Sequence, residues 1–288
     1  MLIKQLPKLR NELHLNILIW WFLKLIYPII LLITLFTNNL LAQSTVEYLD
    51  VKKYAIGVYG VTGLNNHSVD FAKLIGTPNC CSGFESGSGI GLNIGMILQY
   101  PLTQEIELDI RASVLDLGAD LISTQQIPIS NLENSNDGDI AVIEHLISSN
   151  ISTVGLNLGV NYYPLQYLYL HGGAFLGYNI SGVFEQEERL ISPSNRGVFR
   201  ETGTRKRNEL HGDIPELNSL NSFLNLGVGY SLLLNERGTF LLVPEVSFNL
   251  GLNNINSQPW KVNQITFGLA LMFNSLSREY DNPINPVR

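Results

Sequence analysis

The chain has 288 residues, of which 45% are hydrophobic and only 15% are charged, and its formal net charge is −7. Soluble domains usually carry about 25% charged residues, so the composition argues against an ordinary soluble surface. The acidic balance also argues against nucleic-acid binding, which needs cationic groups to contact phosphates. The 25 glycines, 12 tyrosines and 12 phenylalanines favour strands and turns over long helices.

Residues 1–42 are expected to be a secretory signal peptide. Basic residues from Lys4 to Arg10 precede an apolar run at residues 25–36, and small residues lead to a predicted cleavage after Ala42. An uncleaved membrane anchor is the alternative, because residues 17–36 are almost long enough to span a bilayer. A lysine and a proline interrupt that stretch, which favours cleavage. The leader carries a net charge of +3, so the chain from residue 43 onward has a formal net charge of −10.

The rest of the chain contains segments in which apolar and polar residues alternate, the pattern of a strand with one apolar face. In residues 90–100 the even positions are apolar, and in residues 105–114 the even positions are apolar while the odd ones are mostly ionic. Six further runs alternate in the same way, at residues 54–63, 154–163, 167–180, 223–234, 239–251 and 262–273. Each is long enough to cross a bilayer as a tilted strand, which needs about 9 to 11 residues.

The links between these eight strands alternate in length. Those after the second, fourth and sixth strands are tight, at residues 101–104, 164–166 and 235–238. Those after the first, third and fifth are long, at residues 64–89, 123–152 and 182–222. Short periplasmic turns and longer extracellular loops are typical of outer-membrane barrels. The sequence therefore predicts an all-β fold, an eight-stranded antiparallel up-and-down transmembrane β-barrel in a Gram-negative outer membrane, behind a cleaved signal peptide.

Aromatic residues favour this orientation, because amphipathic rings concentrate where strands meet the membrane interface. At the predicted periplasmic ends of the strands lie Tyr54, Tyr100, Tyr162, Tyr163, Tyr167, Tyr169, Tyr230, Phe240 and Phe273. The predicted outer girdle has fewer members, with Tyr178, Phe223 and Trp260 as candidates.

Residues 50–274 resemble the OmpA-type and related small outer-membrane barrels, on the strength of this pattern more than of any motif. The opening strand at residues 54–60 and the loop segments at 78–81, 87–91, 202–208 and 212–215 add to the resemblance. It implies a barrel domain at residues 43–274. Such relatives continue into a periplasmic peptidoglycan-binding domain, whereas here only a polar tail at residues 275–288 follows. The resemblance therefore covers the barrel part alone and puts a cell-wall tethering role in doubt.

Inward positions of the predicted barrel carry polar residues, which we expect to form a hydrogen-bonded network in a narrow lumen. The ionic and titratable members are Glu105, Glu107, Asp109, Arg111, His171 and Glu245, and the amides include Asn93, Gln99, Asn157, Asn161, Asn225 and Gln264. Arg111 is the only cation in this set, so it is expected to pair with Asp109, Glu107 or Glu245, because unpaired charge in a narrow core is costly. The network either fills space or forms a gated proton or ion path.

Four basic residues of the link at residues 182–222 are candidates for contact with lipopolysaccharide phosphates: Arg200, Arg205, Lys206 and Arg207. Guanidinium groups bind phosphate bidentately, which is the reason for this hypothesis. The link also contains seven acidic residues, so a solvated loop of mixed charge is the alternative.

The two cysteines, Cys80 and Cys81, are adjacent in the sequence. Exported proteins meet an oxidising compartment, so a vicinal disulfide and a disulfide between two chains are both open, beside two thiols without a function. No metal site is predicted, because no histidine pair lies near these cysteines.

The leading functional hypothesis is a structural or surface-interaction barrel with long extracellular loops, and the alternative is a narrow channel or transport component. A soluble periplasmic lipocalin-like binder and a lipid-modifying barrel enzyme are less favoured. No catalytic residue is predicted: His67 and Ser68 point to opposite faces of a strand, and the pattern does not assemble His171, Ser113 and Glu245 into a triad. No cofactor is expected. The expected partners are outer-membrane lipid, lipopolysaccharide and, during insertion, the barrel assembly machinery.

Overall fold

A computed structural model describes residues 48–77, 83–128, 140–194 and 197–280. The predicted signal peptide, the cysteine pair Cys80 and Cys81, and most of the predicted tail lie outside the described residues. The chain divides into two compact units, one comprising residues 1–49 with 279–288 and the other Asp50–Arg278. The second unit contains nearly all of the described residues, and the fold and the sites below belong to it.

The described residues form strands, turns and loops, and none belongs to a helix long and apolar enough to cross a membrane. The strands are β1 (Tyr48–Phe71), β2 (Phe84–Pro101), β3 (Ile106–Asp116), β4 (Ala119–Pro128), β5 (Ile140–Tyr162), β6 (Leu168–Ser192), β7 (Lys206–Asp213), β8 (Leu220–Tyr230), β9 (Leu232–Leu233), β10 (Phe240–Gly251) and β11 (Trp260–Tyr280). They belong to one sheet.

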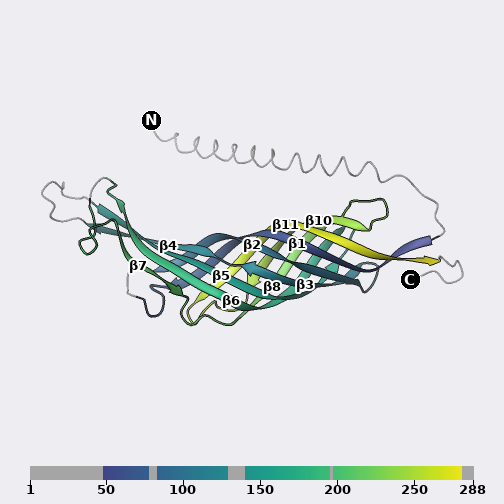
Figure 1. Ribbon diagram of the computed structural model, residues 1–288, viewed down its shortest axis with the longest axis horizontal. Helices are drawn as coiled ribbons and strands as arrows, with labels where there is room; N and C mark the ends of the chain where they lie inside the picture. The colour runs from purple at the N-terminus through teal and green to yellow at the C-terminus, as the bar shows by residue number, and fades with distance from the viewer. Residues whose placement is uncertain (1–47, 78–82, 129–139, 195–196, 281–288) are drawn as a thin grey trace, which may run out of the picture. The chain divides into compact units, whose positions relative to one another are not determined.

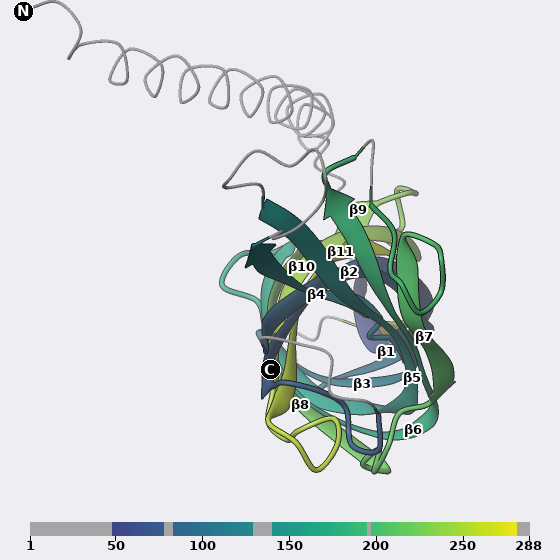
Figure 2. The same ribbon diagram turned by 90° about the vertical axis from the view of Figure 1, so that its left-hand side faces the viewer.

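These eleven strands make eight spans of a closed barrel. β3 and β4 are interrupted only at Leu117 and Gly118 and both pair with β2 and β5, so together they form one span. β7 and β8 both pair with β6, and the two-residue β9 continues β8 along β10. The circuit runs β1, β2, β3 with β4, β5, β6, β8, β10 and β11, and β11 is the neighbour of β1 (Figures 1 and 2). The predicted all-β fold, an antiparallel up-and-down barrel of eight spans, is confirmed, whereas the predicted signal peptide before it stays a prediction.

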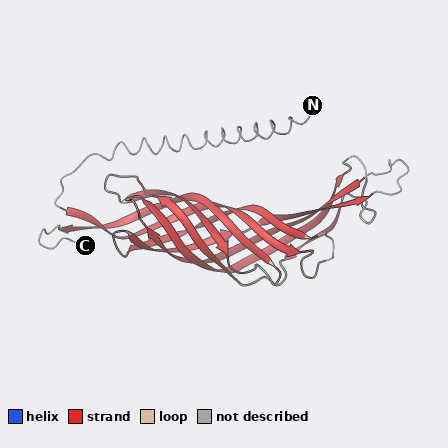
Figure 3. Cartoon of the chain, turned by 180° about the vertical axis from the view of Figure 1, so that it is seen from behind, coloured by secondary structure: helices blue, strands red, loops and turns tan. Residues whose placement is uncertain are grey.

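The two ends of the barrel differ. At one end, here called the turn end, β2 is joined to β3, β5 to β6 and β9 to β10 by short links. Figure 3 draws the strands in red and the turns and loops between them in tan. At the other, the extended end, β4, β5, β6 and β7 continue as a four-stranded sheet beyond the last pairing of β4 with β2, at Gly87 and Leu121 (Figure 1). We call this part the extended sheet.

The outward face of the barrel is apolar. Along β2 the even positions from Ile90 to Tyr100 are 43 to 72% exposed, and the other strands expose leucine, isoleucine, valine and phenylalanine in the same alternation. Ten residue steps of about 3.3 Å, tilted by about 40°, cover about 25 Å along the barrel axis, which matches the apolar band of a transmembrane barrel. The register predicted from the sequence places the apolar residues outward, as the structure does.

The long links expected from the sequence are largely strand. The first strand continues to Phe71, β4 runs to Pro128, β5 begins at Ile140 and β6 ends only at Ser192. In the extended sheet the alternation is partly reversed, because Ile143 and Ile147 are buried on the inward face while polar residues such as Thr124 face outward. The sequence prediction identified strands by apolar residues at outward positions. It therefore ended each strand where the outward face stops being apolar.

Several aromatic residues face the lumen instead of the predicted girdles. Tyr54, Tyr100, Tyr162, Phe240 and Phe273 are exposed at the turn end, and Tyr178 is exposed on β6 toward the extended end, as the prediction requires. The inward-facing exceptions are Tyr163, Tyr169, Phe223 and Trp260. Tyr169, Phe223 and Trp260 share the odd or even parity of buried neighbours on their strands, as Tyr169 does with His171, and Tyr163, one residue past β5, has the odd parity of buried Asn161.

Candidate functional site

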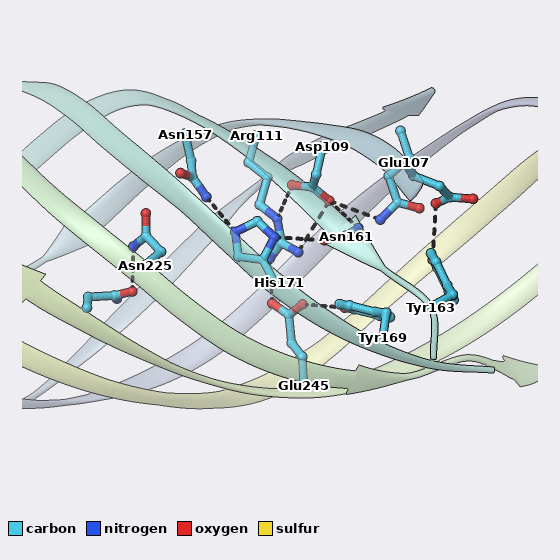
Figure 4. Close-up of polar contacts among 12 residues, drawn as sticks. Glu107, Asp109, Arg111, Asn157, Asn161, Tyr163, Tyr169, His171, Asn225 and Glu245 are labelled. Carbon is cyan, nitrogen blue, oxygen red and sulfur yellow. Dashed lines mark hydrogen bonds and ion pairs between the residues drawn. The ribbon is translucent and has the colours of Figure 1, made fainter. Parts of the chain in front are cut away.

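An ionic cluster on β3 and β10 occupies the middle of the lumen (Figure 4). Nε of Arg111 lies 2.7 Å from Oδ1 of Asp109, and Nη1 of Arg111 lies 2.7 Å from Oε1 of Glu245. All three side chains are buried, at 9% exposure or less. Arg111 thus pairs with two of the three carboxylates named from the sequence, and these come from opposite parts of the barrel wall.

Neutral side chains complete the hydrogen bonding of the two carboxylates. Oδ2 of Asp109 accepts hydrogen bonds from Nε2 of Gln99 at 3.0 Å and from Nδ2 of Asn161 at 3.1 Å. The hydroxyl of Tyr169 donates to Oε2 of Glu245 at 3.0 Å. Because the carboxylate oxygens accept these hydrogen bonds, the free-energy cost of burying their charge is modest. The ring of Tyr59 makes a cation–π contact with Arg111, and its centroid lies 5.4 Å from the guanidinium carbon.

His171 lies beside this cluster and contacts amides. Its Nδ1 is 2.7 Å from Oδ1 of Asn161, and its Nε2 is 3.3 Å from Nδ2 of Asn157. Both ring nitrogens are therefore in hydrogen bonds with asparagine side chains. The arrangement positions an imidazole against amides, not against a serine hydroxyl.

A second ion pair lies nearer the turn end. Nζ of Lys52 is 2.7 Å from Oε1 of Glu107, and the hydroxyl of Tyr163 donates to Oε2 of Glu107 at 3.0 Å. The sequence reasoning missed Lys52, whose even number gives it the parity of outward residues such as Ile56. Glu105, predicted to be lumenal, is exposed in the turn before β3, because the strand begins one residue later than expected.

A group of hydrogen-bonded asparagine and glutamine side chains lies in the lumen between the ionic cluster and the extended end. Oε1 of Gln264 accepts from Nδ2 of Asn93 at 2.8 Å and from Nδ2 of Asn249 at 3.0 Å, while its Nε2 donates to Oδ1 of Asn65 at 2.7 Å. Asn225 donates in turn to Oδ1 of Asn249 at 2.6 Å. Five neighbouring spans, β8, β10, β11, β1 and β2, are thus joined inside the lumen by neutral hydrogen bonds.

Apolar clusters fill the remaining lumen on both sides of these polar groups. The cluster at the extended end, here the extended-end plug, consists of Val69, Phe71, Leu74, Phe84, Leu115, Leu117, Leu121, Ile147, Ile151, Phe175, Phe184, Phe223, Ile214, Ile255, Trp260 and Val262. At the turn end, Ala55, Ile97, Tyr169, Leu241, Val243, Ala270 and Met272 form a smaller cluster. In the plug, the indole of Trp260 donates to Nδ1 of His67 at 2.8 Å, and Nε2 of His67 is 2.9 Å from the carbonyl oxygen of Leu117.

A cavity of about 50 Å³ lies between the ionic cluster and the extended-end plug, lined among others by Tyr59, Arg111, His171 and Glu245. A water needs about 10 to 15 Å³ of such volume, so the cavity has room for about three to five waters. That is enough to hydrate the cluster and far too little for a solute path through the barrel.

A further buried cluster lies on the inward face of the extended sheet. Glu188 is fully buried, and its carboxylate accepts hydrogen bonds from Nε of Arg207 at 2.6 Å and from Nδ2 of Asn208 at 2.5 Å. The guanidinium of Arg207 stacks 4.3 Å from the ring centroid of Phe199. Nδ1 of His145 lies 3.8 Å from Oε1 of Glu188. Sequence reasoning assigned these residues to a loop, so the strand register that brings them together was not available to it.

The structure separates the four basic residues proposed for phosphate contact. Arg205 donates to the backbone carbonyl oxygens of Leu190 and Pro193, at 2.6 and 2.8 Å, and so holds the link between β6 and β7. Lys206 pairs with Glu187 at 2.7 Å on the outward face, whereas Arg207 lies on the inward face. Arg200 is exposed.

Glu187 shows the electrostatic effect of this arrangement. Partial burial acts to raise the pKa of Glu187, but hydrogen bonds from Lys206 and Arg189 outweigh it and hold that pKa below its usual range. The basic residues of the outward face are therefore already engaged with acidic groups of the same sheet. Across the described ranges, no group of three or more histidine, cysteine, aspartate and glutamate side chains is placed to hold a metal ion.

No protein-family model matches the chain, and no curated protein does. Among solved structures, Ail, the attachment invasion locus protein of Yersinia pestis, is 10% identical over 77% of this chain and 99% of its own, with a TM-score of 0.31. Neisserial surface protein A is 10% identical over 75% of this chain and 97% of its own, at a TM-score of 0.35. The outer membrane protease OmpT of Escherichia coli is 9% identical over 81% and 99%, also at 0.35. Likeness at this level carries no function across, so the role of this chain has to be argued from its own residues.

Proposed function

We propose that the chain is an integral outer-membrane β-barrel of the small OmpA-type class that displays the extended sheet at the cell surface. The exposed apolar band around all eight spans supports membrane insertion, since apolar area of this extent is not left in water. The short links then belong in the periplasm and the extended sheet outside, following the usual asymmetry of such barrels.

The filled lumen is the observation that carries a structural or surface-interaction role over a channel. Side chains close the barrel with an apolar cluster near each end and hydrogen-bonded polar groups between them. Moving an ion through it would require breaking the pairs of Arg111 and displacing buried aromatic rings such as Phe175 and Phe223. A non-enzymatic role is supported by the contacts of His171, which involve amides and no nucleophile.

The extended sheet is the part that can meet a partner. Residues 140–151 of β5 continue past the apolar band for 12 residues, which at about 3.3 Å each is about 40 Å of ordered strand. Lipopolysaccharide remains the proposed neighbour of this region, with exposed Arg200 as the phosphate contact that is not engaged in the ion pairs described above. Arg205, Lys206 and Arg207 would have to exchange their present partners to take part.

Two measurements test this proposal. The first compares boiled and unboiled outer-membrane fractions on a gel, where a folded barrel migrates faster than its unfolded form. The second records planar-bilayer conductance of the refolded barrel, and we expect no stable open level. A soluble, unshifted protein would refute the membrane assignment. Steady conductance would replace the structural role with the narrow channel, the alternative that the polar middle of the lumen favours.

A further inference from the structure

The inward face of the extended sheet contains an ionisable residue that the proposed function does not use. His145 lies in the middle of this sheet on β5, paired in register with Ser123 of β4 on one side and Glu188 of β6 on the other. Residues directly opposite each other on neighbouring strands point to the same face. All three side chains are therefore on the inward face, where Ser123, His145 and Glu188 are each buried.

His145 is 1% exposed, and neither of its ring nitrogens has a hydrogen-bond partner among the described residues. A buried imidazole without hydrogen bonds is costly to keep, and it becomes more costly still as a cation unless a carboxylate approaches. Glu188 is that carboxylate, at 3.8 Å, but its oxygens are already occupied by Arg207 and Asn208. Protonation of His145 would therefore place two cations beside one buried carboxylate.

The two cations differ in their freedom to leave. His145 belongs to a central strand, and β5 pairs with β4 and β6 on both sides. Arg207 belongs to β7, which pairs only with β6 among the described strands, and its side chain is 28% exposed. Its Nη1 also lies 3.7 Å from the exposed carboxylate of Glu201. Arg207 can thus exchange Glu188 for water and Glu201, whereas Glu188 is the one carboxylate near His145 in the described part of the chain.

We propose that protonation of His145 transfers Glu188 from Arg207 to the imidazolium and thereby releases β7, together with the segment that carries Phe199, from the extended sheet. The charged groups facing His145 are Glu188 from β6 and Arg207 from β7, while β4 contributes the neutral Ser123 and β6 also contributes Gln186. Because Phe199 is buried under Arg207, release of the guanidinium uncovers this ring. The inference rests on the proposed function only in placing the sheet where external pH reaches it.

The direction of the response follows from the state of His145 in the closed sheet. Burial lowers the pKa of His145, the nearby Glu188 opposes this effect, and Arg207 adds to it. The closed sheet therefore binds fewer protons than the open one once the pH falls below the ordinary histidine pKa of about 6.5. Acid favours opening, and one coupled proton changes the opening equilibrium at most about tenfold for each pH unit.

Amide hydrogen exchange of the full chain in detergent micelles tests the proposal. Protection is compared at about pH 5 and about pH 7.5, on either side of the histidine range, after correction for the intrinsic pH dependence of exchange. We expect up to about a tenfold loss of protection per pH unit in β7 and residues 197–205, with β5 and β6 little changed. His145→Gln should abolish the difference. His211→Gln, which removes an exposed histidine of β7, should keep it.

A second variant tests the proposal independently, in case His145→Gln fails to fold. Arg207→Gln should expose β7 at neutral pH as acid does in the unmodified chain, whereas Lys206→Gln, on the opposite face, should not. The gel shift of each variant reports separately whether the barrel itself is folded, so loss of the barrel is distinguished from loss of the acid response. Equal protection of β7 at both pH values would overturn the proposal. So would an acid response that survives in His145→Gln or that extends equally to β5 and β6.

Discussion

Replacing Arg111 by methionine is expected to destabilise the barrel more than replacing an exposed arginine by methionine. The substitution removes two hydrogen bonds of 2.7 Å and leaves Asp109 and Glu245, 0% and 8% exposed, without a cation. Breaking a buried ion pair by removing one partner typically costs about 3 to 5 kcal/mol. Gln99 and Tyr169 continue to donate to the two carboxylates, so we expect a loss at the lower end of this range.

The assay is urea unfolding of the refolded chain in lipid vesicles, followed by fluorescence. Trp260 is the only tryptophan after residue 42, and it is fully buried in the extended-end plug, so its emission reports the folded barrel. Arg237→Met, in an exposed turn, is the matched control and should change the free energy of unfolding by less than about 0.5 kcal/mol. Arg111→Met combined with Asp109→Asn and Glu245→Gln should recover most of the loss, because the buried charges are then gone. A single variant as stable as the control, or a triple variant no better than the single one, would refute the reasoning.

Three further outcomes are expected. Met96→Arg, at a side chain 68% exposed in the apolar band, should cost about 2 to 4 kcal/mol in vesicles, whereas Thr124→Arg in the extended sheet should cost little, and equal effects by urea unfolding would contradict the position of the band. Gly89→Val should abolish the heat-modifiable band, because a Cβ there would lie 2.2 Å from the carbonyl oxygen of Gly118, while Gly60→Val, with its nearest atom at 4.0 Å, should keep it. Since the pKa of Glu187 is lowered in the folded sheet, its ion pairs stabilise the sheet above the ordinary glutamate range and are lost as the pH falls below about 4. Glu187→Gln should remove that acid-dependent part of the stability, no more than about 1 kcal/mol, and an unchanged acid profile of amide exchange near Lys206 would contradict this.

The fold was predictable because lipid imposes a period of two on the outward face of every span. Apolar residues at alternate positions, such as Ile90 and Met96, are sufficient to find a strand, and the tight links then determine which strands are neighbours. The same parity placed Asp109, Arg111 and Glu245 in the lumen. Their pairing was expected because Arg111 was the only cation among the residues predicted to face the lumen, and unpaired charge is costly there.

Other contacts depend on features that parity does not describe. Lys52 has the parity of lipid-facing positions, yet its long side chain reaches Glu107 from the rim of the barrel. Tyr163 and Tyr169 have inward parity, but they were assigned to the girdle because tyrosine is common there. Their odd positions alone would have placed both side chains in the lumen. The known preference of tyrosine for the membrane interface led to the wrong assignment.

The extended sheet was missed for a different reason. In the proposed orientation the extended sheet lies outside the membrane, where water replaces lipid around the strands and burial of apolar residues such as Ile143 and Ile147 is favoured. The pattern therefore inverts within single strands: β5 exposes Leu156 and Leu158 in the apolar band and buries Ile147 beyond it. His145 and Glu188 lie on the inward face of this sheet, and β7 forms its edge, since among the described strands it pairs only with β6. The same change of solvent that hides these strands from a search for membrane spans would, under our proposal, let the sheet respond to acid while the barrel stays closed.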